Sequence, residues 1–243
     1  MSGIYSNVHA GDSAVNHRVD QVITACFEEP ARELFADGRL SGASFLVKGT
    51  GAGSASTLHQ DWNNVEEDQA ESLSIWCPLV DVDVTNGALQ VIPGSHRSRP
   101  SIRSLDTPSL YLDFTPELDT LLQVLPAAAG EAVLYVHNLF HGSKPNHSGQ
   151  IRVAAVSGVL PRGVRNVHYR RTPSAAEGTF DVLAVQRRFF FDDIPAMAGG
   201  AVPASAKIVD QVQIDNHHLN HEDVQRATKA PRREEANFDS PRR

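Results

Sequence analysis

GEAVLYVHNLFHGSKPNHSGQIRVAAVSGVL (130–160) contains two apolar segments separated by a polar connection. Residues 130–136 and 151–160 are short and rich in valine, alanine and leucine, and glycine, proline and asparagine lie between them. Short apolar segments bounded by turn residues predict two β-strands. The first segment leads into His137 and His141, and Arg152 lies at the start of the second. The stretch therefore predicts a β fold with reactive side chains where one strand ends and the next begins.

Further short strands are predicted upstream of this stretch. They cover residues 44–47, 73–80 and 87–92; Trp76 lies in the second, and Pro93-Gly94 ends the third. Short strands joined by glycine and proline turns are typical of a β-sandwich or jelly roll. The pattern lacks strands that alternate with helices, which argues against a dinucleotide-binding fold. The glycine-rich segment 49–57 lacks the sequence of a phosphate loop and is predicted to be an ordinary loop.

One main helix is predicted near the start of the chain. Apolar residues recur at helical spacing over 14–35, and Pro30 is expected to break the helix. A short helix is predicted at 116–122 with Thr115 as its N-cap, while 180–191 fits either a strand or a helix. Residues 1–14 and the charged tail 226–243 are expected to be poorly ordered. We therefore expect a single domain over residues 1–225.

Composition excludes several classes of protein. The chain has 243 residues, with 22 Lys and Arg against 29 Asp and Glu, a formal net charge of −7. This balance argues against a nucleic-acid partner, because such proteins carry a basic face. Two cysteines, Cys26 and Cys77, fit a reducing compartment. No apolar run approaches the ~20 residues of a membrane span, and the first residues lack a signal-peptide pattern. The sequence therefore predicts a cytoplasmic protein without a membrane partner.

The triplet His59-Gln60-Asp61 is the first candidate for a metal site. On an extended segment, residues two apart point to the same side, so His59 and Asp61 would share a face. Two histidines and one carboxylate with open coordination positions are typical of non-haem Fe(II) that activates oxygen. A surface histidine and a helix-capping aspartate would explain the triplet equally well, so a ligand from elsewhere has to support it.

His141 is the candidate for that third ligand. Gly142 and Ser143 follow it, and Arg152 lies on the next predicted strand. A guanidinium holds a carboxylate through two parallel hydrogen bonds, so Arg152 predicts an anion pocket beside the metal. His137 is the competing ligand. Its spacing of four residues from His141 suits one face of a helix, whereas this segment is predicted to be a strand.

Three motifs, in their order along the chain, resemble one family of enzymes. LHQDW (58–62), WCPLVDVDVTNGALQVIPGSHR (76–97) and HGSKPNHSGQIR (141–152) are similar to motifs of the phytanoyl-CoA dioxygenase family. Its members are Fe(II)- and 2-oxoglutarate-dependent oxygenases, and the resemblance covers about residues 45–160. It implies a mainly β fold, a double-stranded β-helix of the jelly-roll, cupin-like type, with an N-terminal helix and flanking helices. It also implies Fe(II), 2-oxoglutarate as cosubstrate, and O2.

The resemblance also implies the roles of individual residues in the metal site. His59, Asp61 and His141 match the iron ligands and are thus the catalytic residues. Gln60 lies between two of them and is expected to point away. Related halogenases carry Gly or Ala at the position of Asp61, which leaves a coordination site for chloride. The presence of Asp61 therefore argues against halogenation.

The same resemblance implies a cosubstrate site. Arg152 matches the arginine that binds the distal carboxylate of 2-oxoglutarate, and Ser143 matches a serine that assists it. Trp76 matches an aromatic residue on the cosubstrate side of the barrel, although plain core packing would explain it equally well. Lys48, at the end of an earlier predicted strand, is a further residue within reach of the pocket.

The implied function is hydroxylation of a small-molecule metabolite or natural-product intermediate, with release of succinate and CO2. Desaturation, epoxidation and ring formation use the same iron site and stay open, as does the oligomeric state. The alternative is a cupin-like protein that binds a metal or ligand without 2-oxoglutarate chemistry. Arg152 together with Ser143 separates the two, because a protein that only binds metal needs no site for a dicarboxylate.

Other polar residues have two explanations each. Arg97, Arg99 and Arg103 fit either contacts to an anionic substrate or an exposed charged loop. Six further histidines fit pocket-rim, turn or surface positions, and the three near the C-terminus fit either a small metal cluster or a solvated segment. These histidines are His96, His147, His168, His217, His218 and His221.

Overall fold

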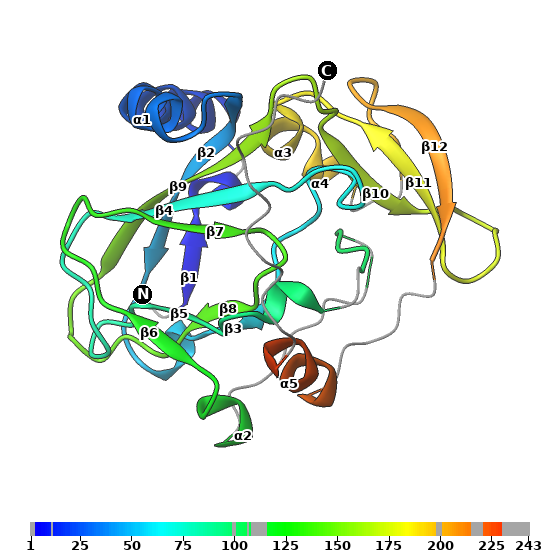
Figure 1. Cartoon of the computed structure of the whole chain (residues 1–243). Coiled ribbons are helices and arrows are strands. Elements are labelled where there is room, and N and C mark those ends of the chain that lie inside the picture. The colour runs from blue at the N-terminus through cyan, green and yellow to red at the C-terminus, as the bar shows by residue number, and fades with distance from the viewer. Residues whose placement is uncertain are drawn as a thin grey trace.

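Two antiparallel sheets face each other and form the body of the protein (Figure 1). The structure is a computed structural model, and it describes residues 3–10, 12–98, 101–105, 107, 116–197, 201–214 and 221–229. The larger sheet has the strand order β1 (Ile4–Ser6), β2 (Gly38–Lys48), β9 (Arg152–Pro161), β4 (Leu73–Pro78) and β7 (Val133–Val136). The smaller sheet has the order β3 (Ser56–His59), β8 (His141–Ser143), β5 (Leu89–Val91) and β6 (Gln123–Leu125). The predicted mainly β, jelly-roll type of fold is confirmed.

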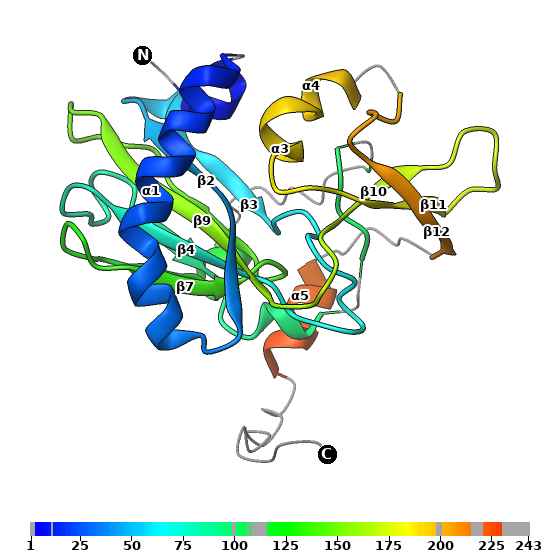
Figure 2. The same cartoon turned by 90° about the horizontal axis from the view of Figure 1, so that it is seen from above.

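Strand β9 shows how the sequence distributes side chains between the two faces of the larger sheet. Ala155 packs with Ile23 of helix α1 (Ser13–Leu34) on the outer face. Ala154 instead packs with Trp76 between the two sheets. Because side chains alternate along a strand, Arg152 shares the inner face with Ala154. Figure 2 shows α1 lying across the outer face, so the helix covers the face of the sheet opposite to Arg152.

A third sheet lies beside the other two (Figures 1 and 2). It has the order β10 (Val167–Arg171), β11 (Thr179–Ala184) and β12 (Lys207–Gln213). Two short helices, α3 (Phe189–Asp192) and α4 (Ile194–Met197), follow β11 and pack through Phe189 and Met197 against Leu183. The apolar segment 180–191, which fitted either structure by pattern, is therefore a strand followed by a helix.

The expected break of α1 at Pro30 is wrong. The helix runs unbroken past this residue, and the Asp12 side chain caps its first turn by accepting from the Val15 amide at 3.1 Å. A proline inside a helix removes one hydrogen bond and costs about 3 kcal/mol. Ala31 and Ile23 lie on the face of α1 that packs against the sheet. The burial of that face over the whole length of the helix outweighs the lost hydrogen bond.

Both ends of the chain contain more structure than expected. Residues 4–6 form β1 and pair with β2, with Tyr5 opposite Val47, and the turn η1 (Asn7–Ala10) follows. Strand β2 also runs well beyond the predicted 44–47, because it pairs with β9 from Gly38 to Lys48. Residues 226–229 of the predicted tail belong to helix α5 (His221–Lys229), and the rest of the tail lies outside the described residues. Within the described residues, no helix combines the length and apolarity needed to cross a bilayer.

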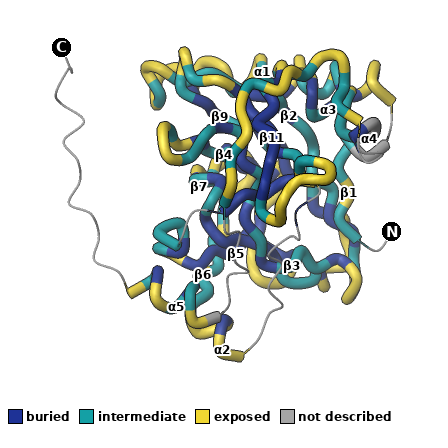
Figure 3. The backbone as a smooth tube through the Cα atoms, turned by 90° about the vertical axis from the view of Figure 1, so that its right-hand side faces the viewer, coloured by how far each residue is buried: buried dark blue, intermediate teal, exposed yellow. Residues whose placement is uncertain are grey.

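Helix α5 completes an apolar cluster under the smaller sheet. Val224 is fully buried with Leu58 of β3 and with Phe140, which directly precedes β8. The short helix α2 (Pro116–Asp119) adds Leu118, and the turn η3 (Ser95–Arg97) lies against α5. Figure 3 shows that buried positions concentrate in the strands, whereas exposed positions concentrate in the connections. The smaller sheet is therefore supported from behind by a segment far away in sequence.

We expect Val224→Ala to lower the free energy of unfolding by about 1–3 kcal/mol, because it leaves a cavity in this cluster. Urea unfolding followed by circular dichroism measures the change. Val84→Ala is the matched control, since Val84 is 69% exposed in a turn, and it should change the value by less than about 0.5 kcal/mol. Equal effects of the two substitutions would contradict the packing of α5.

Candidate active site

The pairing of β3 with β8 brings the predicted metal ligands together. His59, the last residue of β3, lies opposite His141, the first residue of β8. Asp61 follows two residues after His59, and its Oδ1 lies 3.9 Å from His59 Nε2 and 3.6 Å from His141 Nε2. One ligand atom from each of the three residues lies within 4.8 Å of the others. Within the described chain, this His59-Asp61-His141 triad is the group that can hold a metal ion.

Backbone contacts fix the ring orientation of both histidines. Nδ1 of His59 lies 2.8 Å from the carbonyl oxygen of Thr57, and Nδ1 of His141 lies 3.0 Å from that of Leu139. A neutral ring has one N–H, and a carbonyl accepts it, so the lone pair is left on Nε2. Burial, and then the neighbouring His141, lower the pKa of His59 to about 4. At neutral pH, His59 is therefore an uncharged ring that offers Nε2 toward Asp61.

Three separate contacts hold Asp61. Its amide donates to the carbonyl of His137 at 2.8 Å, and its own carbonyl accepts from Arg103 Nε at 2.6 Å. Ser74 Oγ donates to its Oδ2 at 3.0 Å. Burial alone would raise the pKa of Asp61, but the nearby histidines, His141 first, and the Ser74 hydroxyl bring it below its ordinary value. The site therefore contains an ionised carboxylate whose peptide is fixed on both sides.

The basic stretch of the long loop has a structural role instead of an exposed one. Arg103 is buried and forms an ion pair with Glu67, and it donates to the Ser101 carbonyl at 3.0 Å. Arg97 lies 3.4 Å from the carbonyl oxygens of Ala227 and Thr228 at the end of α5. Arg99 lies outside the described residues. Neither the exposed-loop explanation nor the substrate-anion explanation holds for Arg103, because its donors are already used within the protein.

The predicted cosubstrate residues lie between the two sheets, with Arg152 and Trp76 on the larger sheet and Ser143 on the smaller one. Arg152 is 3% exposed, and its guanidinium lies over the Trp76 ring at 5.3 Å from the ring centroid. Nε of Arg152 has no hydrogen-bond partner among the described residues. Ser143, two residues after His141, is buried and accepts from Lys48 Nζ at 2.8 Å. Trp76 also belongs to the core between the sheets, as the packing explanation predicted.

The competing residues lie elsewhere. His137 is buried behind Asp61, with Nδ1 at 2.7 Å from Ser72 Oγ, and it does not join the triad. Gln60 points away from the triad and donates to the carbonyl of Asn138. His168 is buried between Trp62 and the aromatic side chains of α3 instead of lying at a rim or on the surface. His217 and His218 lie outside the described residues.

Sequence reasoning missed Tyr135. Its hydroxyl lies 3.4 Å from His141 Nε2, and its ring stacks obliquely at 4.6 Å from that histidine. Burial first, and then the charge of Asp61, raise the pKa of Tyr135 well above its ordinary value, so the hydroxyl stays protonated. The alternation of side chains along a strand could have identified Tyr135. It lies opposite Ser74 across the β4–β7 pair, and the two side chains share a face.

A comparison with protein families supports this geometry. The model of the family described as Phytanoyl-CoA dioxygenase (PhyH) matches residues 6–154. The chain belongs to the phytanoyl-CoA dioxygenase family. The match includes His59, Asp61, His141 and Arg152, and it begins upstream of the motifs that carry the resemblance in the sequence. No protein of curated function matches the chain.

This PhyH-family chain is similar to several solved structures. The epimerase SnoN, in complex with Fe3+, alpha ketoglutarate and nogalamycin RO, is 19% identical over 88% of this chain and 76% of its own, with a TM-score of 0.51. The carbocyclase SnoK from nogalamycin biosynthesis is 24% identical over 56% of this chain and 55% of its own, with a TM-score of 0.44. The chain spans 28% of EvdMO1, 53% of EvdO2 from Micromonospora carbonacea var. aurantiaca and 52% of AviO1 from Streptomyces viridochromogenes Tue57.

The residues present fit the cofactors of the PhyH family. The donor set, two imidazole nitrogens and one carboxylate, is the one that non-haem Fe(II) oxygenases use. The unpartnered, buried Nε of Arg152 fits an oxygen anion such as the distal carboxylate of 2-oxoglutarate. The predicted cofactors, Fe(II) with 2-oxoglutarate and O2, are thus in agreement with both the family and the donor set.

We expect His59→Ala and His141→Ala each to weaken Co(II) binding by at least about a hundredfold, because each removes one of three ligand atoms. Anaerobic titration followed by visible absorption measures the affinity. His147→Ala is the control, since His147 is exposed and outside the triad. Unchanged Co(II) affinity in both triad variants would show that the metal binds elsewhere.

We expect Arg103→Met to destabilise the fold by about 3–5 kcal/mol, because Glu67 is then a buried charge without a partner. The double variant Arg103→Met/Glu67→Gln removes that charge and should regain most of the stability. It should still bind Co(II) roughly tenfold more weakly than wild type, because the Asp61 peptide has lost its donor. Wild-type affinity in the stable double variant would show that Arg103 does not position Asp61.

Proposed function

We propose that the protein is an Fe(II)- and 2-oxoglutarate-dependent dioxygenase that hydroxylates a small-molecule metabolite or natural-product intermediate. In the balanced reaction, a substrate C–H bond, 2-oxoglutarate and O2 become an alcohol, succinate and CO2. Membership of the PhyH family and the His59-Asp61-His141 triad support the reaction class. Asp61 supports hydroxylation over halogenation, because its carboxylate occupies the position that a halide would need.

The observation that carries the proposal is the buried positive charge beside the triad. Arg152 and Lys48 are 3% and 0% exposed, and they face each other across the β2–β9 pair. No carboxylate among the described residues forms an ion pair with either of them. Buried charges are stable only when they are paired, so this pocket requires an anion from outside the chain. A dicarboxylic keto acid fits, because one end reaches the metal while the other reaches the cations.

Each residue of the chain has a distinct part in this mechanism. His59, Asp61 and His141 would hold Fe(II), which supplies oxygen activation when bound. Arg152 and Ser143 would hold the distal carboxylate and so fix the direction in which the keto acid enters. Trp76 forms the wall against which the guanidinium stacks and excludes water from it. Tyr135 keeps its proton and lies within reach of the His141 ring on the inner side.

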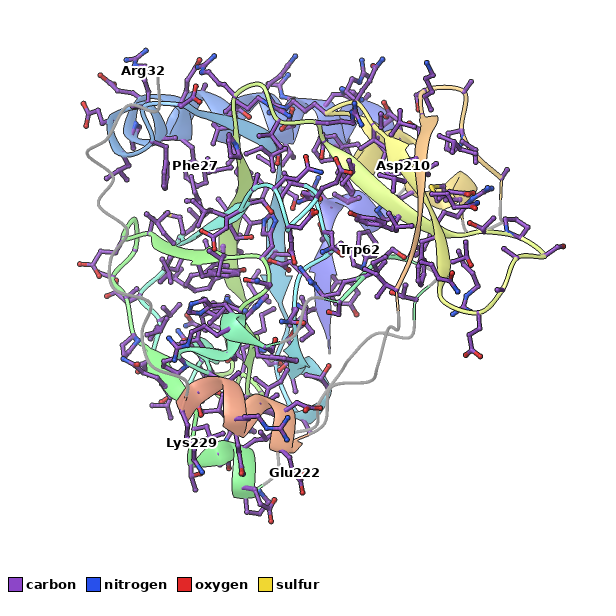
Figure 4. The ribbon with its side chains drawn as sticks, turned by 45° about the vertical axis from the view of Figure 1, so that its right-hand side comes forward. Phe27, Arg32, Trp62, Asp210, Glu222 and Lys229 are labelled. Atoms are coloured by element: carbon purple, nitrogen blue, oxygen red, sulfur yellow. The ribbon has the colours of Figure 1, made fainter. Side chains whose placement is uncertain are left out.

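The substrate would approach from the side on which the ligands are accessible. The His59 and Asp61 side chains are 25% and 29% exposed, whereas that of His141 is 6% exposed. Trp62, directly after Asp61, lies between the two-sheet body and the β10–β12 sheet (Figure 4), in edge contact with His168. An aromatic surface beside an accessible metal site is suited to an organic molecule of mainly apolar character.

The alternative, a cupin-like protein that binds metal without 2-oxoglutarate chemistry, explains the triad but not the pocket. Such a protein has no use for the buried guanidinium of Arg152, and its burial without a counter-ion would only destabilise the fold. The structure of the pocket therefore favours the oxygenase over the metal-binding protein.

We expect 2-oxoglutarate, added without oxygen to the Fe(II)-loaded protein, to produce a weak visible charge-transfer band. Admission of O2 should then release succinate slowly, even before the substrate is known. Arg152→Ala should need at least about tenfold more 2-oxoglutarate for the same band, because it loses a charge-assisted contact. His147→Ala should behave like wild type. Iron-loaded, folded wild type without a band or succinate would contradict the proposed function.

A further inference from the structure

Lys48 is completely buried and lies next to Arg152 across the β2–β9 pair. It is the last residue of β2, and the segment with the short turn η2 (Ala52–Ser54) closes over it. Its Nζ donates to Ser143 Oγ at 2.8 Å and to the backbone carbonyl of Ser54. Across the sheet it lies in register with Arg152. Lys48 therefore contacts Ser143, one of the two residues proposed to hold the distal carboxylate.

Among the described residues, the groups around Lys48 include a positive charge and no negative charge. Arg152 on β9 carries a charge, whereas Ser143 on β8, Ser54 on η2 and Gly87 before β5 are neutral. Burial first, and then the charge of Arg152, lower the pKa of Lys48 to about 7. A large part of the Lys48 side chains is therefore uncharged at neutral pH while no anion is bound.

The hydrogen bonds of Lys48 agree with an uncharged amine. A neutral amine has two N–H groups, and an ammonium has three. The two acceptors in contact with Nζ, Ser143 Oγ and the Ser54 carbonyl, match the two N–H groups of the neutral form. Protonation would add a third N–H in a buried place, and this N–H needs an acceptor. An anion on Arg152 and Ser143 would provide that acceptor.

Close packing holds the lysine in this position. Gly87 has φ +76°, and a Cβ added to it would lie 2.4 Å from Lys48 Cε and 2.6 Å from the carbonyl oxygen of Lys144. The backbone passes over the aliphatic part of Lys48 so closely that only glycine fits. Lys48 therefore cannot swing out to solvent to gain its charge, and the charge has to form in the pocket.

We propose that Lys48 is a second cationic contact for the distal carboxylate of 2-oxoglutarate and takes up a proton from solvent as that carboxylate binds. The lone pair of Nζ forms the new N–H bond, water or buffer supplies the proton, and nothing is oxidised or reduced. The inference rests on the proposed function, because it needs 2-oxoglutarate in the pocket. It makes cosubstrate affinity depend on pH through a residue that is not a metal ligand.

The sign of the pH dependence follows from proton uptake. Below pH 7, Lys48 is already protonated, and binding needs no further proton. Above pH 7, binding has to draw a proton from solvent, so affinity falls by up to about tenfold per pH unit until the pKa of the complex is reached. The number of protons taken up per 2-oxoglutarate should be close to zero at pH 6 and close to one at pH 8.

Anaerobic calorimetry of the Fe(II)-loaded protein tests the inference without turnover. Titration with 2-oxoglutarate in buffers of different ionisation enthalpy gives both the affinity and the proton count. Lys48→Met should bind about tenfold or more weakly than wild type at pH 6 and should lose the proton uptake at pH 8. Lys144→Met is the matched control, since Lys144 is exposed and paired with Asp119, and it should match wild type in both measurements.

The outcomes separate this inference from the proposed function. Wild type that binds 2-oxoglutarate with the same proton count at pH 6 and pH 8 would overturn the inference and leave the proposed function intact. Equal affinities of wild type and Lys48→Met would do the same. Wild type that does not bind 2-oxoglutarate would overturn both. The proton count needs only the wild-type protein, so the test stands even if Lys48→Met fails to fold.

Discussion

The rest of the site depends on the antiparallel pairing of β3 with β8. The pairing sets His59 opposite His141, and each ring is oriented by the carbonyl of the residue two positions earlier. The intervening residues, Leu58 and Phe140, point to the apolar cluster on the other side. The short β3–β8 pairing thus turns both imidazole rings toward the triad and buries two large apolar side chains on the opposite face. A shift of either strand by one residue would turn its histidine toward the apolar cluster and its apolar side chain toward the triad.

Charge is distributed unevenly in the space between the two sheets. At one end, an ionised aspartate lies beside the rings of His59 and His141, and its peptide is fixed by Arg103 and by the His137 carbonyl. At the other end, Arg152 and Lys48 are buried without an acidic partner among the described residues. Such a separation is costly in a low-dielectric interior. A ligand with a metal-binding head and an anionic tail would relieve the cost, and its orientation would be dictated by the protein.

The sequence predicted the jelly-roll fold, because strand length, turn residues and motif order are local signals. The His59-Asp61-His141 group could be predicted from the sequence for the same reason, since the motifs that contain these residues keep fixed spacing. Arg103 was misjudged, because burial of a charged loop residue depends on Glu67 and Asp61, which lie far away in sequence. The predicted break of α1 at Pro30 and the predicted disorder from Arg226 onward were wrong for a similar reason. Burial against distant strands keeps both segments helical. Lys48 was noticed, but nothing in its local sequence shows that it lacks a counter-ion.

The position of α5 has a consequence for the synthesis of the protein. The helix is made after every strand of the three sheets, yet Val224 fills the cluster behind both ligand-bearing strands. Until residues 221–229 leave the ribosome, Leu58 and Phe140 have no cover from α5 on that side. The emerging chain therefore exposes apolar surface beside an unfinished metal site. We therefore expect the His59-Asp61-His141 triad to become rigid only after the helix has been released and packed.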